Sequence, residues 1–565
     1  MILYIYEKNY FMKKQKHFLL FSVLLVLVGC AKEKNYSPIS GQTNTVNRVH
    51  SLTEDEKKDW HLKDIELDTI PGISLQRAYD SLLKGKKGKE VIVAVLDTKL
   101  DIHHEDLKDQ LWVNKDEIPN NNIDDDQNGY VDDVHGWNFL GNTKNEDLLY
   151  QKYSCLRFVE KYEPYFKGKH EKDLNVNDSL LFIQYNYARE EFDKRVKGKK
   201  SGFAYANMLL KSLADREKAL FVYFPKRKYN LSDLDSLKKV YPNNKILQRD
   251  ILIRSNFMKW GYSKEFMEEN KRGVVAMFDK MLNPLYDERG VVGDNSSDLG
   301  DAFYGNGILH GDVPFEHSIG VSGLLGATRN NNKGINGISN YIKIMPVVMV
   351  ASGDEHDKDV ALAIRYAVDN GAQIINMSWG KNFSLHSDWV IKAMKYAESK
   401  DVLLVTAAGN DGNNNDVKKI HPDDNNKGKE FLTNFISVGA TGFNLDDKLK
   451  ASFSNYGYKN VDVYAPGSFL FTTATKNTYE IGSGTSYASP IVSGVAALVK
   501  SYYPSLTAVQ VKRVLLESGV SYAIDVNIGD RKKEKLVPFS SLSKSGKIVN
   551  AYNALLMAKK ISKTK

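Results

Sequence analysis

The stretch 482–490, which reads Gly-Ser-Gly-Thr-Ser-Tyr-Ala-Ser-Pro, brings a serine hydroxyl to the start of a predicted helix. Its glycine-rich turn runs into a segment of small residues and leaves Ser486 in the first helical turn. The free N–H groups and the positive end of a helix can stabilise the negative charge that develops when a hydroxyl attacks a carbonyl. A lone serine in this place is more often a plain N-cap. Ser486 is therefore a candidate nucleophile that needs partners elsewhere in the chain.

Two further side chains could make such a hydroxyl reactive. Asp97 ends the apolar run 91–96, whose length and branching predict a buried parallel strand. Open α/β sheets carry their chemistry at the carboxyl ends of strands. His317 opens a predicted helix with a small-residue face, which suits close packing on a sheet. Each residue also has a plain interpretation, because Asp97 could cap a turn and His310 is a competing histidine without such a helix.

Two later strand ends could contact a substrate. The predicted strand 374–378 runs into Ser378-Trp379-Gly380, which could offer its backbone to an extended peptide. The predicted strand 402–407 leads to Asn410, an amide side chain at the edge of a sheet. Gly-Asn followed by Asp-Gly is also common turn chemistry, so Asn410 alone would be interpreted as a turn residue.

The elements that must position these side chains alternate along the chain. Predicted strands and helices follow one another at 343–350, 357–370, 374–378, 387–400 and 402–407. This βαβ rhythm predicts an α/β fold, a parallel β-sheet flanked by helices on both faces. With 42% apolar and 26% charged residues, the chain can bury a substantial core.

Residues 141–283 differ in character, being rich in Lys, Glu, Tyr and Leu. Helix-like stretches lie at 178–197, 204–224 and 263–282, and 232–235 resembles a capping box that opens a further short helix. No group of chemically competent side chains stands out. We predict a helical insertion, acting as a lid or contact surface, that interrupts a domain spanning 84–560.

An acidic loop at 124–133 could hold a cation. Oxygen-bearing side chains alternate along it in the manner of a calcium loop, namely Asp124, Asp126, Asn128 and Asp132. His135 stands where an EF-hand would have a bidentate glutamate. Structural Ca²⁺ and a solvated acidic turn both remain open, and the chemistry at Ser486 requires no cofactor.

The N-terminus is typical of an exported protein. Lysines at 13, 14 and 16 precede the apolar run 18–28, which is too short for a permanent membrane span. The run ends in Leu-Val-Gly-Cys30, which resembles a bacterial lipobox. This predicts a lipoprotein signal peptide at 1–29, a lipid on Cys30 and a tether with an N-terminal extension at 30–83. The alternative is an ordinary signal peptide with an accidental cysteine.

This segment predicts a protein anchored by lipid in a bacterial cell envelope, at the outer membrane or the cell surface. Cys155 is then left without a partner, so no disulfide framework is expected. The net charge of +8 is small for 565 residues and favours neither nucleic acid nor a polyanionic substrate. The oligomeric state stays open.

Taken together, the order aspartate, histidine, asparagine, serine resembles the subtilisin-like serine peptidases, the subtilase family. The matching segments are Val-Ala-Val-Leu-Asp97-Thr, His317 with its small-residue helix, Ser378-Trp-Gly, Ala-Ala-Gly-Asn410 and Gly-Thr-Ser486-Tyr-Ala-Ser-Pro. The resemblance covers about 84–140 and 284–560. It implies a serine endopeptidase acting on polypeptides, in which calcium often braces surface loops.

The resemblance also implies a role for each residue. Ser486 would attack the peptide carbonyl, His317 would take its proton and pass it to the leaving amine, and Asp97 would orient His317. Asn410 would bind the oxyanion together with the backbone N–H of Ser486. The segment 378–380 would pair with the substrate as an added strand.

The sequence departs from the family pattern beside two of these residues. Lys99 stands where the family usually has glycine, and Ser318-Ile319 stands where it usually has Gly-Thr. Either change could shift the histidine pKa or close a subsite. Two alternatives follow: a binding or scaffold protein of the same fold with weakened catalysis, and an esterase that uses the same residues.

Overall fold

The computed structural model describes residues 36–40, 52–311, 317–426, 428–529 and 533–564. The predicted signal peptide and Cys30 lie outside the described residues. Contacts divide the chain into two units, 1–39 and 40–565, and every described helix and strand belongs to the second unit. No helix in the described ranges combines the length and apolar character that a bilayer span requires.

Seven parallel strands form the central sheet in the order β2-β3-β1-β4-β5-β8-β9. Their apolar runs reflect burial on both faces, which confirms the predicted parallel α/β sheet. β1 lies between β3 and β4, far from the sheet edges. The strands are β1 Val91–Asp97, β2 Trp137–Asn138, β3 Ile342–Val348, β4 Ile374–Met377, β5 Leu403–Ala407, β8 Phe435–Thr441 and β9 Val463–Pro466.

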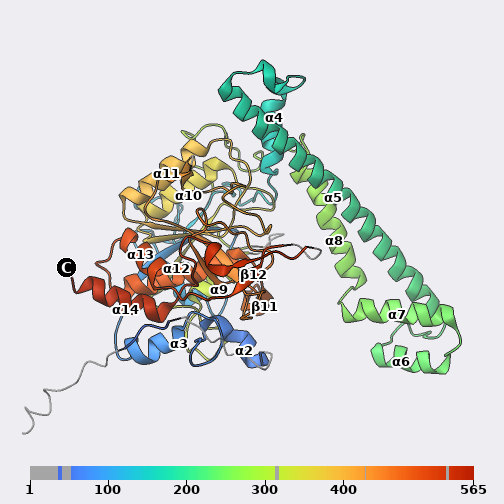
Figure 1. The fold of residues 1–565 in the computed structure, drawn as a ribbon. Coiled ribbons are helices and arrows are strands. Elements are labelled where there is room, and N and C mark those ends of the chain that lie inside the picture. Colours follow the sequence, from blue (N-terminus) through green and yellow to red (C-terminus); the bar gives the residue numbers. More distant parts are fainter. Residues whose placement is uncertain (1–35, 41–51, 312–316, 427, 530–532, 565) are drawn as a thin grey trace, which may run out of the picture. The chain divides into compact units, whose positions relative to one another are not determined.

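Helices cover both faces of this sheet (Figure 1). On one face α10 and α11 pack together and contact β1, β3 and β5. On the other face α12 crosses β1, β4, β5, β8 and β9 and packs against α9, α13 and α14. These helices are α9 Ser318–Gly326, α10 Asp357–Asp369, α11 Ser387–Ser399, α12 Thr485–Tyr502, α13 Ala508–Ser518 and α14 Ala551–Ser562.

Shorter elements surround the sheet. β10 and β11 form an antiparallel hairpin, as do β12 with β13 and β6 with β7. These elements are α2 Glu54–Asp59, α3 Leu75–Ala78, β6 Asn425–Asn426, β7 Lys429–Glu430, β10 Leu470–Ala474, β11 Thr478–Gly482, β12 Asp525–Asn527 and β13 Leu536–Pro538. Single helical turns are η1 Trp60–Leu62, η2 Tyr79–Leu83, η3 Lys108–Gln110, η4 Glu171–Asp173, η5 Met277–Met281 and η6 Phe539–Ser541.

A helical arm, defined here as residues 154–281, is built from consecutive helices. α5 and α8 lie side by side, α7 packs against α5, and α6 packs against α7 (Figure 1). Three apolar clusters hold these helices, and the first joins the arm to Phe383 of the loop after β4. The arm helices are α4 Ser154–Phe166, α5 Val176–Phe221, α6 Leu231–Val240, α7 Lys245–Lys259 and α8 Lys264–Ala276.

Two details of the arm differ from the sequence-based expectation. The predicted helices 178–197 and 204–224 are one continuous helix, α5, of 46 residues. Gly198 and Gly202 each weaken a helix by about 1 kcal/mol relative to alanine, yet α7 and α8 pack along α5 and support it. The capping box of α6 is formed by Asn230 and Asp233, not by residues 232–235. Cys155, near the start of α4, is buried and is a free cysteine.

Candidate active site

The carboxyl end of β1 and the start of α9 bring an aspartate and a histidine into contact. Asp97 is the last residue of β1 and is only 1% exposed. Nδ1 of His317 lies 3.0 Å from both carboxylate oxygens of Asp97. We assign the ring proton to Nδ1 from this contact, which leaves Nε2 as the basic nitrogen. The two residues are 220 positions apart in the sequence, so the fold alone creates the pair.

The residue after Asp97 fixes the start of α9. Oγ1 of Thr98 accepts hydrogen bonds from the backbone N–H groups of His317 (3.1 Å) and Ser318 (3.0 Å). The N–H of Thr98 itself donates to Oδ1 of Asp97 at 2.7 Å. The end of β1 thus caps α9, and one short segment holds both the ring and the backbone of His317.

The charge of Asp97 determines the basicity of His317. Burial lowers the pKa of the imidazole, but the Asp97 charge and its hydrogen bond raise it by more, and Glu480 adds a smaller rise. The resulting pKa lies above the ordinary value of 6.5. Such a ring is a stronger base toward a hydroxyl, provided that the pH is high enough to keep it neutral.

Ser486 is the second residue of α12 and is 8% exposed. Four residues later Pro490 lacks the N–H that would bond to the carbonyl of Ser486 in a regular helix. The hydroxyl of Ser378 takes that place and donates to this carbonyl at 2.8 Å. The backbone of Ser486 is therefore tied directly to the residue that follows β4.

A buried amide continues this link into the sheet. Nδ2 of Asn376, in β4, donates to Oγ of Ser378 at 2.9 Å. Its Oδ1 accepts hydrogen bonds from the hydroxyls of Ser489 (2.8 Å) and Ser493 (3.0 Å) in α12. A network in which every buried polar group has a partner is rigid, so β4 and the first turns of α12 are held in one register.

Asn410 follows β5 and lies beside Ser486. Its Oδ1 accepts hydrogen bonds from the N–H (2.8 Å) and the hydroxyl (2.9 Å) of Thr485, which fixes the amide. A methyl group on Cα of Gly484 would lie 2.8 Å from Oγ of Ser486 and 3.6 Å from both Nδ2 of Asn410 and N of Ser486. The hydroxyl oxygen of Ser486 and two N–H donors thus surround one small space that Gly484 leaves open. A carbonyl under attack needs this arrangement around its oxygen.

The other predicted substrate contacts are also at this edge of the sheet. Ser378, Trp379 and Gly380 directly follow β4, and Ser378 contacts Ser486 as described. Nε1 of Trp379 donates to the carbonyl of Leu96 at 2.8 Å, which fixes its side chain over the end of β1. Gly380 is exposed.

Two residues near His317 were absent from the sequence-based set. The ring of Tyr487 lies 5.6 Å from the His317 ring, between centroids, and Tyr487 directly follows the nucleophile. Glu480 lies on β11 and acts electrostatically on both rings. Adjacency to Ser486 could have indicated Tyr487. No sequence signal indicates Glu480, because only the β10–β11 hairpin brings it here.

The three atypical residues of the sequence are either paired with other groups or buried. The ammonium of Lys99 lies 2.6 Å from Oδ2 of Asp147 and donates to the carbonyl of His310 at 3.2 Å, so its charge is paired away from Asp97. Ser318 and Ile319 are buried in α9 and expose no surface to a substrate. The competing histidine, His310, instead packs its ring 5.0 Å from that of His103.

The acidic loop forms a carboxylate cluster that includes one residue missed in the sequence. Ligand oxygens of Glu117, Asp124 and Asp126 lie within 4.8 Å of one another. Asn128 donates its N–H to both Asp124 and Asp126 at 3.0 Å. Asp132 instead accepts the N–H groups of residues 121 (3.2 Å) and 122 (2.9 Å). Glu117 precedes the loop by a turn, so the alternating spacing could not indicate it.

The charge and burial of this cluster suit a bound cation. Burial raises the pKa of Glu117, and the neighbouring charge of Asp126 raises it as well, against backbone hydrogen bonds that lower it. A divalent cation would relieve that repulsion, and carboxylate oxygens are the ligands that Ca²⁺ prefers. His135 takes no part, because its Nδ1 lies 2.7 Å from the carbonyl of Trp112. The cluster could therefore bind a metal ion.

Comparisons with known proteins agree with this geometry. Residues 312–541 match the model of the subtilase family, a range that contains His317, Asn410 and Ser486 and begins after Asp97. Over 186 residues the chain is 39% identical to the thermophilic serine proteinase of Bacillus sp. (strain AK1), covering 33% of this chain and 42% of that protein. The chain is also 37% identical over 186 residues to thermitase of Thermoactinomyces vulgaris, which covers 33% of this chain and 61% of that protein.

A third relative is matched over most of its length. The chain is 30% identical over 257 residues to subtilisin DY of Bacillus licheniformis, which covers 45% of this chain and 84% of that protein. This extent, together with the Asp97–His317 contact and the position of Ser486, leads to one conclusion. The chain belongs to the subtilase family of serine proteases.

Proposed function

We propose that this chain is a serine endopeptidase that hydrolyses peptide bonds through Ser486, His317 and Asp97. The observation that carries the proposal is the contact of Nδ1 of His317 with both oxygens of Asp97 at 3.0 Å. A histidine held in this way presents its other nitrogen as a base. The ring of Tyr487, the residue after Ser486, lies 5.6 Å from the His317 ring. The relative from Bacillus sp. (strain AK1) is a serine proteinase by name, which supports the same activity.

The mechanism follows from these positions. Nε2 of His317 takes the proton of the Ser486 hydroxyl as the oxygen attacks the peptide carbonyl, and Asp97 stabilises the imidazolium that forms. Nδ2 of Asn410 and the N–H of Ser486 hold the negative oxygen of the tetrahedral intermediate. His317 then gives its proton to the leaving amine, and a water molecule, deprotonated by the same nitrogen, releases the acyl group from Ser486.

Labelling with a fluorophosphonate probe tests this function. We expect the probe to label wild-type protein at Ser486 and to fail with Ser486→Ala and His317→Ala, because both remove the activated nucleophile. Ser483→Ala, three residues away in the same turn, is the matched control and should label normally. Absence of label on well-folded wild-type protein would replace this function with the binding or scaffold alternative. Turnover of esters without turnover of casein would favour the esterase.

We also propose that Glu117, Asp124 and Asp126 hold a structural calcium ion that braces the loop. The support is the spacing of their oxygens and the pKa of Glu117, which burial raises. Calcium added to metal-free protein should raise the melting temperature, as expected for a ligand that binds only the folded state. Glu117→Gln should remove most of that rise. An unchanged melting temperature in wild-type protein would exclude the site.

We further propose that the protein is exported and anchored to the cell envelope by a lipid on Cys30. The support is the basic segment, the apolar run 18–28 and the residues before Cys30. Mass spectrometry of the mature N-terminal peptide should find an acylated cysteine, and Cys30→Ser should move the protein to the soluble fraction. An unmodified Cys30 in the mature protein would rule the anchor out.

A further inference from the structure

At Asp97 the edge of the sheet is bordered by the segments that follow β3 and β4. β1 lies between β3 and β4 and ends at Asp97, whereas the chain continues beyond the ends of both neighbours. Strands in a sheet lie about 4.8 Å apart, so the segments that follow β3 and β4 are separated by the space of one missing strand. We call this space the strand slot. One rim is 349–355 and the other is 378–381.

One end of the strand slot is at the nucleophile. Ser378 opens the second rim and bonds to the carbonyl of Ser486 at 2.8 Å. Lys381 pairs with His421 on the outer side of this rim, with N–H···O distances of 3.0 and 2.9 Å in the two directions. Main-chain groups alternate in direction along an extended strand. The N–H and carbonyl of Gly380 therefore face the strand slot.

At the other end of the strand slot, the side chain of Lys381 reaches from its own rim to the opposite rim. Its ammonium donates to the carbonyl of Glu355 at 2.5 Å and lies 2.8 Å from Oδ1 of Asp357, both on the opposite side. The Lys381 and Asp357 side chains are 3% and 4% exposed. A buried, paired cation is held in place strongly, because separating the pair would leave a buried charge without a partner.

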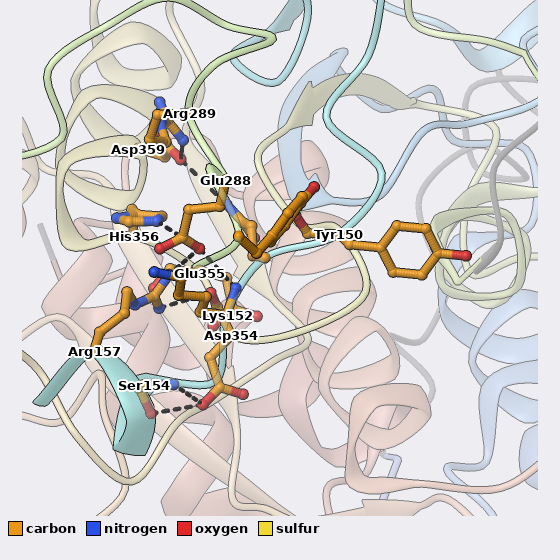
Figure 2. A network of polar contacts seen from close by, with 12 residues as sticks. Tyr150, Lys152, Ser154, Arg157, Glu288, Arg289, Asp354, Glu355, His356 and Asp359 are labelled. Carbon is orange, nitrogen blue, oxygen red and sulfur yellow. Dashed lines mark hydrogen bonds and ion pairs between the residues drawn. The ribbon is translucent and has the colours of Figure 1, made fainter. Parts of the chain in front are cut away.

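The helical arm holds the same rim from outside. A guanidinium nitrogen of Arg157, in α4, donates to the carbonyls of Asp354 (2.7 Å) and Glu355 (2.9 Å). The N–H and hydroxyl of Ser154 donate to Oδ2 of Asp354 at 2.8 and 2.6 Å. Figure 2 shows Ser154 and Arg157 facing Asp354 and Glu355. These carbonyls are thus occupied by the arm and by Lys381.

We propose that Lys381 ends the strand slot on the acyl side of the scissile bond, and that the enzyme recognises peptides through about three residues before that bond, given about 3.3 Å per residue between Ser378 and Lys381. A fourth residue must turn out of the strand slot and adds no main-chain pairing. Longer polypeptides are still cut, but they gain no affinity from residues further upstream. This inference rests on the proposed function, because it places the scissile carbonyl at Ser486.

A ladder of acetylated peptide p-nitroanilides of two to five residues, with the same final two residues, tests the proposal on wild-type enzyme. We expect kcat/KM to rise from two residues to three and then to change less than about two-fold up to five, because only groups inside the strand slot bind the transition state. A rise of ten-fold or more from three residues to four would overturn it.

Variants test whether Lys381 is the cause. Lys381→Ala combined with Asp357→Asn removes the long side chain without leaving a buried charge. It should raise kcat/KM for four residues over three by about 5- to 10-fold, because the carbonyl of Glu355 loses one donor and becomes available to the substrate main chain. Lys381→Arg keeps a long cation, so kcat/KM should stay nearly equal for substrates of three, four and five residues. If kcat/KM in the double variant also stays equal from three to five residues, Lys381 does not set the length of peptide that is recognised. Fluorophosphonate labelling at Ser486 in each variant separates this failure from failure of the proposed function.

Discussion

The parallel sheet and the helical arm are held together in opposite ways. In the sheet, neighbours come from distant parts of the chain, as where Val91 pairs with Ile342. In the arm, each helix packs on one that is close in sequence, around clusters of its own. The comparison teaches that the chemistry depends on long-range contacts of the sheet, such as that of Asp97 with His317. We therefore expect that the far end of the arm can change without disturbing those contacts.

The largest effect should come from the long-range pair itself. Asp97→Asn places an amide beside Nδ1 of His317, which favours the wrong ring tautomer and removes the charge that stabilises the imidazolium. We expect kcat to fall by roughly 10⁴-fold with little change in the far-UV circular dichroism spectrum. Assays on a peptide p-nitroanilide measure this loss. A fall of less than ten-fold would mean that the pair is not the source of activation.

Substitution of Asn410 tests a second long-range contact of the site, the one between Asn410 and Thr485. Asn410→Ala should lower kcat by about 100- to 1000-fold, which is the loss known for the oxyanion-hole asparagine of subtilisin, a member of the same family. KM should stay nearly unchanged, because the lost donor acts on the transition state. Asn410→Asp keeps an acceptor for Thr485 but lacks the N–H groups, so it should lose as much. Near-normal activity of the aspartate variant would exclude the oxyanion role.

The two regions also differ in how far sequence alone could predict them. Buried parallel strands are apolar runs with sharp ends, so the predicted strand 343–350 and helix 387–400 agree within two residues with β3 and α11. α5 was predicted as two helices, because glycines at 198 and 202 look like breaks unless the packing of α7 and α8 is known. Helix propensity depends on the local sequence, whereas the packing that overrides it comes from other parts of the chain.

The site shows the same limit. Sequence motifs indicated Asp97, His317 and Ser486 separately. The contact between Asp97 and His317 could not be predicted from residue spacing, because the two residues are 220 positions apart. Glu117 escaped notice because it joins the acidic loop only through the fold. Lys381 and Arg157 could not be predicted for a similar reason, since both donate to backbone carbonyls, which carry no sequence signature. Sequence thus indicated the reacting groups better than the groups that limit access to them.

Two matched isoleucine-to-alanine substitutions, one in the arm and one in the sheet, test the difference between these regions. Ile251→Ala in α7 and Ile375→Ala in β4 remove the same atoms from sites that are 1% and 0% exposed, and each should cost about 2–5 kcal/mol of stability. In α7 the loss should stay local, so hydrogen exchange rises in the arm and kcat/KM for a three-residue substrate stays within two-fold. In β4 it should lower the global melting temperature and the activity. Equal loss of activity in both variants would show that the arm and the site form one cooperative unit.

The smallest expected effect concerns Glu480, which reaches His317 only through the β10–β11 hairpin. His317 must be neutral to act as a base, so kcat/KM should rise with pH through its pKa, which the Asp97 contact sets above 6.5 and Glu480 raises slightly further. Glu480→Gln removes a negative charge and lowers that pKa, so the acidic limb of the pH profile should move to lower pH. Because Glu480 is exposed, the shift should shrink as salt is added. Glu480→Asp keeps the charge and should leave the profile in place, whereas a shift toward higher pH in Glu480→Gln would show that the hairpin acts on His317 by packing and not by charge.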